Sequence, residues 1–366
     1  MAGLSPVHTN QEYNIHFVST SNTATPLEIA ELVVDEMNEI GSKGFIAYDP
    51  MTKSEVLVMS VLLCFLADSP MHAEVTSTPY PGSSNKPCQV CHLGVMKRED
   101  KETLKYVQDF FGINKVANRD WEQNKANTKE LWTISQTGKQ ADFDLKEKIY
   151  GVKDALNSEL MDIVKNNPTE KARIASIISA EPLRIYNLFT WLNAFDGSHD
   201  TPVEILHVFL LGAVKYLFTD FMNKSKHNHA KIEAHLGAFD TGSLNIPPIQ
   251  AHYMIQHYGS FIGKDYRIVL QVAPFVLFRF MTEQERELWY ELHYLGSLLF
   301  QTHIHNLDAY LQELQLHIDL FLFHVIKMSA RWANKPKFHM LVHLPASIRQ
   351  FGPPSLFATE KFKKLQ

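Results

Sequence analysis

Residues 56–70, VLVMSVLLCFLADSP, contain the longest apolar run of the chain and end in a polar break at Asp68, Ser69 and Pro70. The run from Val56 to Ala67 is nearly continuous rather than alternating, which is typical of a strand buried on both faces, although a helix has the same apolar character. It is also well short of the roughly 20 apolar residues that a membrane span requires. We therefore predict a buried strand here and no transmembrane helix.

The segments on either side extend this pattern. Tyr13–Val18 and Phe45–Tyr48 are β-rich, Pro26–Ile40 has apolar residues at helical spacing, and Thr76–Pro87 has the composition of a loop. After about residue 97 the periodicity is helical over 99–111, 143–165, 168–179, 182–195, 202–222, 282–301 and 304–332. The proline-containing break over 243–250 favours a turn between helical hairpins. The pattern predicts an α/β beginning followed by a mainly helical chain.

The composition excludes several classes of protein. The 366 residues are 45% hydrophobic and 20% charged, which is typical of a folded chain rather than a disordered one. A formal net charge of −5 argues against a protein that coats nucleic acid through its overall charge, so any contact with DNA has to be local. Three cysteines cannot form a disulfide framework, and the start of the sequence lacks the pattern of a signal peptide. We expect an intracellular protein without a membrane partner.

Cys88 and Cys91 form a C-x-x-C motif at the end of a polar loop, and this spacing lets two thiolates bind one tetrahedral zinc. The chain has no second C-x-x-C, so the other ligands would be histidines. His339 and His343 are the best pair, because four residues along a helix place two imidazoles on one face. The alternatives are two ordinary thiols with a core and a surface histidine, or a redox-active cysteine pair.

Carboxylates at unusual positions are candidates for catalysis. Asp68 follows the buried run, where α/β folds place catalytic or metal-binding groups, and Glu360 stands in the otherwise neutral stretch PPSLFATEKF. The alternatives are a helix cap or turn residue for Asp68 and a solvated surface acid for Glu360. Glu204 and His207 lie three residues apart on a strongly apolar helix, where a buried acid and imidazole need each other or a ligand. Mutual pairing without a further function is the alternative for this pair.

Six stretches carry a family pattern in one order: YNIHFVSTSNTATPLEIAELVVDE, VLVMSVLLCFLADSPMHAE, PCQVCHLGV, HDTPVEILHVFLLGAVKYLF, SLNIPPIQAHYMIQHYGSFIGKDYRIVLQVAPFVLF and NKPKFHMLVHLPASIRQFGPPSLFATEKF. Together they resemble the transposase of CACTA (Spm-like) DNA transposons, most closely its fungal branch. The resemblance covers nearly the whole chain, and several blocks in one order are far more specific than any single motif.

The resemblance implies a fold and a set of catalytic residues. The transposases have an RNase H-like core in which three acidic residues hold two divalent ions, Mg²⁺ or Mn²⁺, for phosphodiester cleavage and strand transfer. It places Asp68 at the second acid, Glu360 at the last acid, and Glu204 with His207 at a [DE]-x-x-H motif. The fold it implies is α/β, with an incomplete RNase H-like core and a large, mainly α-helical insertion.

The resemblance also implies a structural zinc. In the related catalytic subunit of the V(D)J recombinase, a C-x-x-C after the second acid and two histidines shortly before the last acid share one zinc. Cys88, Cys91, His339 and His343 follow the same order. The implied domains are residues 1–95 as the N-terminal part of the core with the C-x-x-C loop, 96–335 as the helical insertion, and 336–366 as the C-terminal part of the core.

The first catalytic acid has no counterpart in this sequence, because the only acidic residue before Tyr13 is Glu12, in the polar setting HTNQEYN. Two acids leave solvent to supply the remaining ligands of a metal pair. We therefore expect a transposase-derived protein that is inactive as this chain. The alternatives are a non-catalytic, zinc-organised protein that binds DNA or another protein, and a fragment without a selected function. The resemblance further implies DNA of transposon ends as a partner, a possible homo-oligomer and residence in the nucleus.

Overall fold

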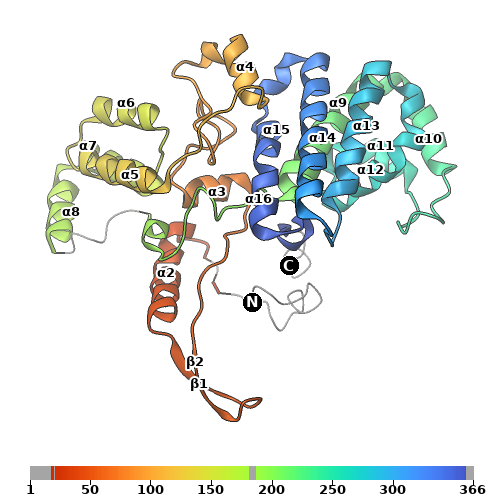
Figure 1. The fold of residues 1–366 in the computed structure, drawn as a ribbon. Helices are drawn as coiled ribbons and strands as arrows, with labels where there is room; N and C mark the ends of the chain where they lie inside the picture. Colours follow the sequence, from red (N-terminus) through yellow and green to blue (C-terminus); the bar gives the residue numbers. More distant parts are fainter. Residues whose placement is uncertain (1–17, 20, 181–186, 360–366) are drawn as a thin grey trace. The chain divides into compact units, whose positions relative to one another are not determined.

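The computed structural model describes residues 18–19, 21–180 and 187–359. In these ranges the chain is mostly helical and has one small sheet of two antiparallel strands (Figure 1). The large helical part agrees with the sequence analysis, whereas the RNase H-like core stays a prediction. The contacts divide the chain into two compact units, one from residues up to 100 together with 116–202, the other from 101–115 together with residues from 203 onward. Among the described residues, none of the helices combines the length and the apolar character that crossing a membrane requires.

The first unit begins with helix α2 (Pro26–Ser42), which confirms the helix predicted from Pro26. A reciprocal pair of hydrogen bonds starts the helix: the Thr25 hydroxyl accepts from the Glu28 amide, and the Glu28 carboxylate accepts from the Thr25 amide. The buried face of α2 then joins a core cluster made by Leu27, Ala30, Val34, Val75, Trp121, Phe189, Leu192 and Phe195.

The predicted buried strand over Val56–Ala67 is wrong. Strand β2 (Ser54–Val58) covers only the start of the run and pairs with β1 (Phe45–Asp49) in a hairpin whose side chains are exposed or half-buried. Residues 59–68 have no regular secondary structure, and within them Leu62 and Phe65 pack against the α2 cluster. The run is therefore continuous because it serves two elements in succession, not because one strand is covered on both faces. The strand predicted at Phe45–Tyr48 is confirmed, and Tyr13–Phe17 lie outside the described residues.

Helix α3 (Ser69–Val75) follows, and then the predicted loop over Thr76–Pro87, which is confirmed. The unit continues with α5 (Trp121–Ser135), α6 (Gln140–Tyr150), α7 (Ala155–Asn166), α8 (Pro168–Ala180) and the 3₁₀ helix η3 (Leu188–Trp191). Helix α8 confirms the prediction for 168–179. Helix α5 was not predicted, because its buried residues include Asn124, Thr128 and Ser135, and these polar side chains obscure the apolar period.

Two helix predictions in this unit are wrong. The single helix expected over 143–165 is two helices, because Gly151 ends α6 with φ +62° and the buried Asp154 caps α7. The helix expected over 182–195 is not found in its described part, where residues 187–195 contain only η3. Residues 181–186 lie outside the described ranges.

The second unit contains helices and no strand among its described residues. The 3₁₀ helix η2 (Arg98–Glu102) and helix α4 (Leu104–Phe110) cover the helix predicted over 99–111. In place of one α-helix over 202–222, the chain forms η4 (Leu206–Val214), a π-helix, and then α9 (Lys215–Lys224). Further along lie η5 (Lys226–Asn228), α10 (His229–Gly237), α11 (Ala251–His257), η6 (Tyr258–Ser260), α12 (Gly263–Val276) and η7 (Phe278–Phe280). The break predicted over 243–250 is confirmed as the connection between α10 and α11.

Two long helices complete the packing. Helices α13 (Glu283–Leu299) and α14 (Leu307–Met328) confirm the predictions for 282–301 and 304–332, and they pack side by side (Figure 1). Their contact buries Leu288, Leu292, Leu314 and Ile318 completely. The chain then turns through η8 (Ala330–Asn334) into a consecutive helical stretch made of α15 (Pro336–Met340), η9 (Leu341–His343) and α16 (Leu344–Phe351), followed by η10 (Pro354–Leu356). The histidine pair lies on this stretch.

Candidate metal centre

The C-x-x-C motif forms a tight, buried turn. Cys88 and Cys91 are 1% and 0% exposed, and both are thiols rather than halves of a disulfide. The Cys88 sulfur accepts hydrogen bonds from the amides of Val90 and Cys91, each at 3.3 Å. Amide donors aimed at a sulfur favour its negatively charged form, so the turn is shaped to present a thiolate.

Residues 117–119 form backbone hydrogen bonds with the segment that contains this turn. The His92 amide donates to the Ala117 carbonyl at 2.9 Å, and the Arg119 amide donates to the Val90 carbonyl at 2.8 Å, which gives a short β-bridge between Cys91 and Asn118. Arg119 also donates through Nε to the Cys88 carbonyl at 2.9 Å. The sequence analysis missed this contact, because Arg119 lies about 30 residues away in a stretch that carries no motif.

The histidine pair is oriented by its own helices and by α4. His339 is 2% exposed, and its Nδ1 lies 2.7 Å from the Phe110 carbonyl oxygen. Since a carbonyl only accepts, Nδ1 carries the proton and donates, and this tautomer leaves the Nε2 lone pair for a metal. His339 Nε2 lies 3.1 Å from His343 Nε2. The helical spacing predicted for the pair is confirmed by this convergence.

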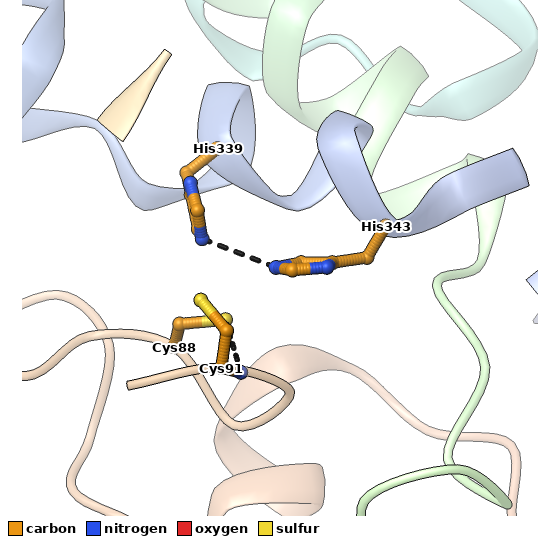
Figure 2. Close-up of side chains that lie close together, drawn as sticks. All are labelled: Cys88, Cys91, His339 and His343. Atoms are coloured by element: carbon orange, nitrogen blue, oxygen red, sulfur yellow. Dashed lines mark hydrogen bonds between the residues drawn. The ribbon is translucent and has the colours of Figure 1, made fainter. Parts of the chain in front are cut away.

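The four side chains come together as one cluster (Figure 2). One ligand atom from each of Cys88, Cys91, His339 and His343 lies within 4.8 Å of the others. In a tetrahedral zinc site with Zn–N bonds of about 2.05 Å, two imidazole nitrogens are about 3.3 Å apart, close to the separation found for the histidines. Throughout the ranges that the structure describes, this is the one group of three or more His, Cys, Asp or Glu side chains placed to hold a metal. The cluster could hold a metal such as zinc.

The pKa of Cys91 shows how closely the two cysteine side chains interact. The hydrogen bond with Cys88, burial, and the negative charge of Cys88 all raise the pKa of Cys91 above its ordinary value. Two buried thiols side by side therefore resist losing both protons, and a bound divalent cation reverses that balance because it stabilises both thiolates directly. The pKa of the neighbouring His92 is lowered by burial and by the positive charges of Arg119 and Lys86.

Asp68 is not part of this cluster. Asp68 is the N-cap of α3, and its carboxylate accepts a hydrogen bond of 3.0 Å from the Met71 amide. This is the helix-capping role considered as the alternative, and Asp68 belongs to no metal-holding group among the described residues. Glu360 lies outside the described residues.

Glu204 and His207 form a buried pair at the start of η4. The two side chains are 1% and 17% exposed and contact each other through Glu204 Oε1 and His207 Nδ1. Glu204 also accepts hydrogen bonds from the amides of Leu206 at 2.8 Å and His207 at 2.7 Å, and a longer one from Thr359 at 3.4 Å. Burial acts to raise the pKa of Glu204, but these hydrogen bonds and the His207 charge outweigh it and lower the pKa below its ordinary value. The pair is thus satisfied within the protein.

No protein-family model, curated protein or solved structure matches this chain. The assignment of a metal site therefore depends on the donor atoms of the four side chains alone. Two thiolates and two imidazoles are the ligand set of structural zinc sites, in which four protein ligands leave no position for substrate. The burial of Cys88, Cys91 and His339 favours the same interpretation.

Proposed function

We propose that this chain is a transposase-derived protein that binds one structural Zn²⁺ through Cys88, Cys91, His339 and His343 and, organised in this way, binds DNA. The observation that carries the proposal is the convergence of these four donors within 4.8 Å from stretches about 250 residues apart in the sequence. The resemblance to the related V(D)J recombinase subunit pairs the same four residues on independent grounds, namely their order relative to the candidate catalytic acids Asp68 and Glu360.

Contact with DNA is proposed from the resemblance and from a local excess of positive charge. No acidic residue occurs between Asp319 and Glu360, whereas this stretch contains Lys327, Arg331, Lys335, Lys337 and Arg349. Most of these side chains have partners: Lys327 pairs with a glutamate, and both arginines pair with aspartates. Lys337 donates to the Leu211 carbonyl at 3.0 Å. Lys335 and Lys337 both lie over the Tyr216 ring, 5.3 and 5.9 Å from its centre.

A lysine pair beside an aromatic ring suits a nucleic-acid backbone, because the lysines meet phosphates electrostatically while the ring packs against sugar or base. We assign Lys335, Lys337 and Tyr216 to this contact. The resemblance also implies residence in the nucleus. Cleavage is not expected, since the sequence offers candidates for only two of the three acids, Asp68 and Glu360.

The metal part of the proposal is tested by the zinc content of the purified full chain, measured by native mass spectrometry. We expect one zinc in the wild type, and no zinc in Cys88→Ser or His339→Ala, because three ligands hold the ion far more weakly than four. Cys64→Ser is the matched control and should keep the zinc, since Cys64 is outside the cluster. A folded wild type without zinc, or zinc retained in both ligand variants, would contradict the proposal.

The DNA part is tested by retention of a random-sequence duplex library on the zinc-loaded protein. We expect binding that weakens as salt rises and that falls in Lys335→Gln but not in Lys43→Gln, a control lysine on the first unit that is paired with Glu39. Incubation with Mg²⁺ or Mn²⁺ should leave the duplex intact. Failure to retain any duplex would refute DNA binding, and metal-dependent cleavage lost in Asp68→Asn would establish the catalytic alternative instead.

A further inference from the structure

Arg119 is a buried cation beside the cysteine turn. The residue is 3% exposed, and its guanidinium donates from Nε to the Cys88 carbonyl and from Nη1 to the Gly151 carbonyl, both at 2.9 Å. Its Nη2 is buried and has no hydrogen-bond partner within the described part of the chain. Among the residues that the structure describes, Arg119 therefore spans two backbone carbonyls and pairs with no carboxylate.

The charges that act on Arg119 come from the cysteines. Burial lowers the pKa of Arg119, and the negative charges of Cys88 and Cys91 counteract this effect. Burial and the charge of Arg119 lower the pKa of Lys86, and burial and the charges of Arg119 and Lys86 lower the pKa of His92.

A buried guanidinium without an anion is costly, because removing a charge from water costs several kcal/mol unless an opposite charge lies close by. Neutral thiols at Cys88 and Cys91 provide no such charge, whereas two metal-bound thiolates do. Arg119 contacts the cysteine turn through the Cys88 carbonyl, so thiolates at Cys88 and Cys91 would lie close enough to attract its charge.

We propose that Arg119 is a positioning residue of the zinc site, whose buried charge stabilises the thiolates of Cys88 and Cys91 and so raises the affinity of the site for Zn²⁺. This inference rests on the zinc site proposed above. It assigns the role to the charge of Arg119, in addition to the hydrogen bond by which the side chain holds the turn. The loaded centre and Arg119 would then stabilise each other.

The test compares Arg119→Gln, which retains hydrogen-bond donors but loses the charge, with Arg119→Lys, which retains the charge but cannot span both carbonyls. Zinc affinity is measured on the full chain by competition with a chromophoric chelator. We expect Arg119→Gln to weaken binding by about 10- to 100-fold, the usual effect of removing a group that supports metal ligands, and Arg119→Lys by no more than about threefold. Lys125→Gln, a surface lysine paired with Glu122, is the control and should bind like the wild type.

Cobalt substitution separates a charge effect from a collapsed site. At saturating Co²⁺ both Arg119 variants should show the sulfur-to-cobalt absorption of the wild type, because the four ligands stay in place. Equal affinities of the wild type and Arg119→Gln, or an equal loss in Arg119→Lys and Arg119→Gln, would overturn the inference. If Arg119→Gln does not fold, Arg119→Lys decides alone, since a tenfold loss there would show that charge is not what matters. A wild type that binds neither Zn²⁺ nor Co²⁺ would refute the zinc site itself, which is a different result.

Discussion

Serine at position 88 is expected to remove the stabilisation that zinc gives to this protein, and this is the largest effect we predict. A ligand that binds only the folded state stabilises it by about 4 kcal/mol when its free concentration is 1,000 times its dissociation constant, and structural zinc sites bind tightly enough to reach this range. With zinc present, Cys88→Ser should therefore unfold at a clearly lower temperature than the wild type. Thermal unfolding followed by circular dichroism measures the difference.

Removing zinc from the wild type with a chelator should have the same effect on stability as Cys88→Ser. Adding a strong chelator should lower the melting temperature of the wild type to near that of Cys88→Ser, and the variant itself should not respond, because it has no zinc to lose. Cys64→Ser is the control: Cys64 is half-buried and lies in the irregular segment 59–68, outside the metal cluster, so this variant should respond to the chelator as the wild type does. An equal response in Cys88→Ser and the wild type would mean that the stabilising metal lies elsewhere.

Replacing Glu204 by alanine is expected to cost about 3–5 kcal/mol, the usual effect of removing one partner of a buried charged pair. The substitution removes the carboxylate that pairs with His207 and that accepts from the amides of Leu206 and Thr359. Equilibrium unfolding in urea measures the loss. Glu233→Ala provides the matched control, because Glu233 also pairs with a histidine, His252, but on the surface, where such a pair contributes at most about 1 kcal/mol.

The Glu204 pair also predicts a pH dependence. The pKa of Glu204 is lower in the folded protein than its ordinary value of 4.5, so the unfolded chain binds the proton more readily. The stabilisation is therefore complete above about pH 4.5 and is lost as the pH falls through the folded pKa. Between pH 7 and pH 3 the wild type should lose more stability than Glu204→Gln does. If both lose the same amount, the Glu204 carboxylate is not the group responsible.

The fold was predictable where a helix can be recognised from the residues of its own segment. Helices α2, α13 and α14 combine regular apolar spacing with a polar face, and this information lies within each segment. The apolar run at Val56–Ala67 could not be assigned in this way, because its composition suits a buried strand, a helix or an extended segment equally. Tertiary packing decided the outcome: the hairpin uses the first residues of the run, and Leu62 and Phe65 then pack on the α2 core.

The sequence by itself determined which side chains were available for a metal and how each pair was held. The C-x-x-C spacing of Cys88 and Cys91 and the helical spacing of His339 and His343 are local properties of short segments, so they were visible without a structure. Only the tertiary structure brought the two pairs within 4.8 Å, and only it placed the buried charge of Arg119 against the cysteine turn. Such convergence depends on the packing of the chain between the segments, and no local pattern records that packing because each contact joins residues far apart in sequence.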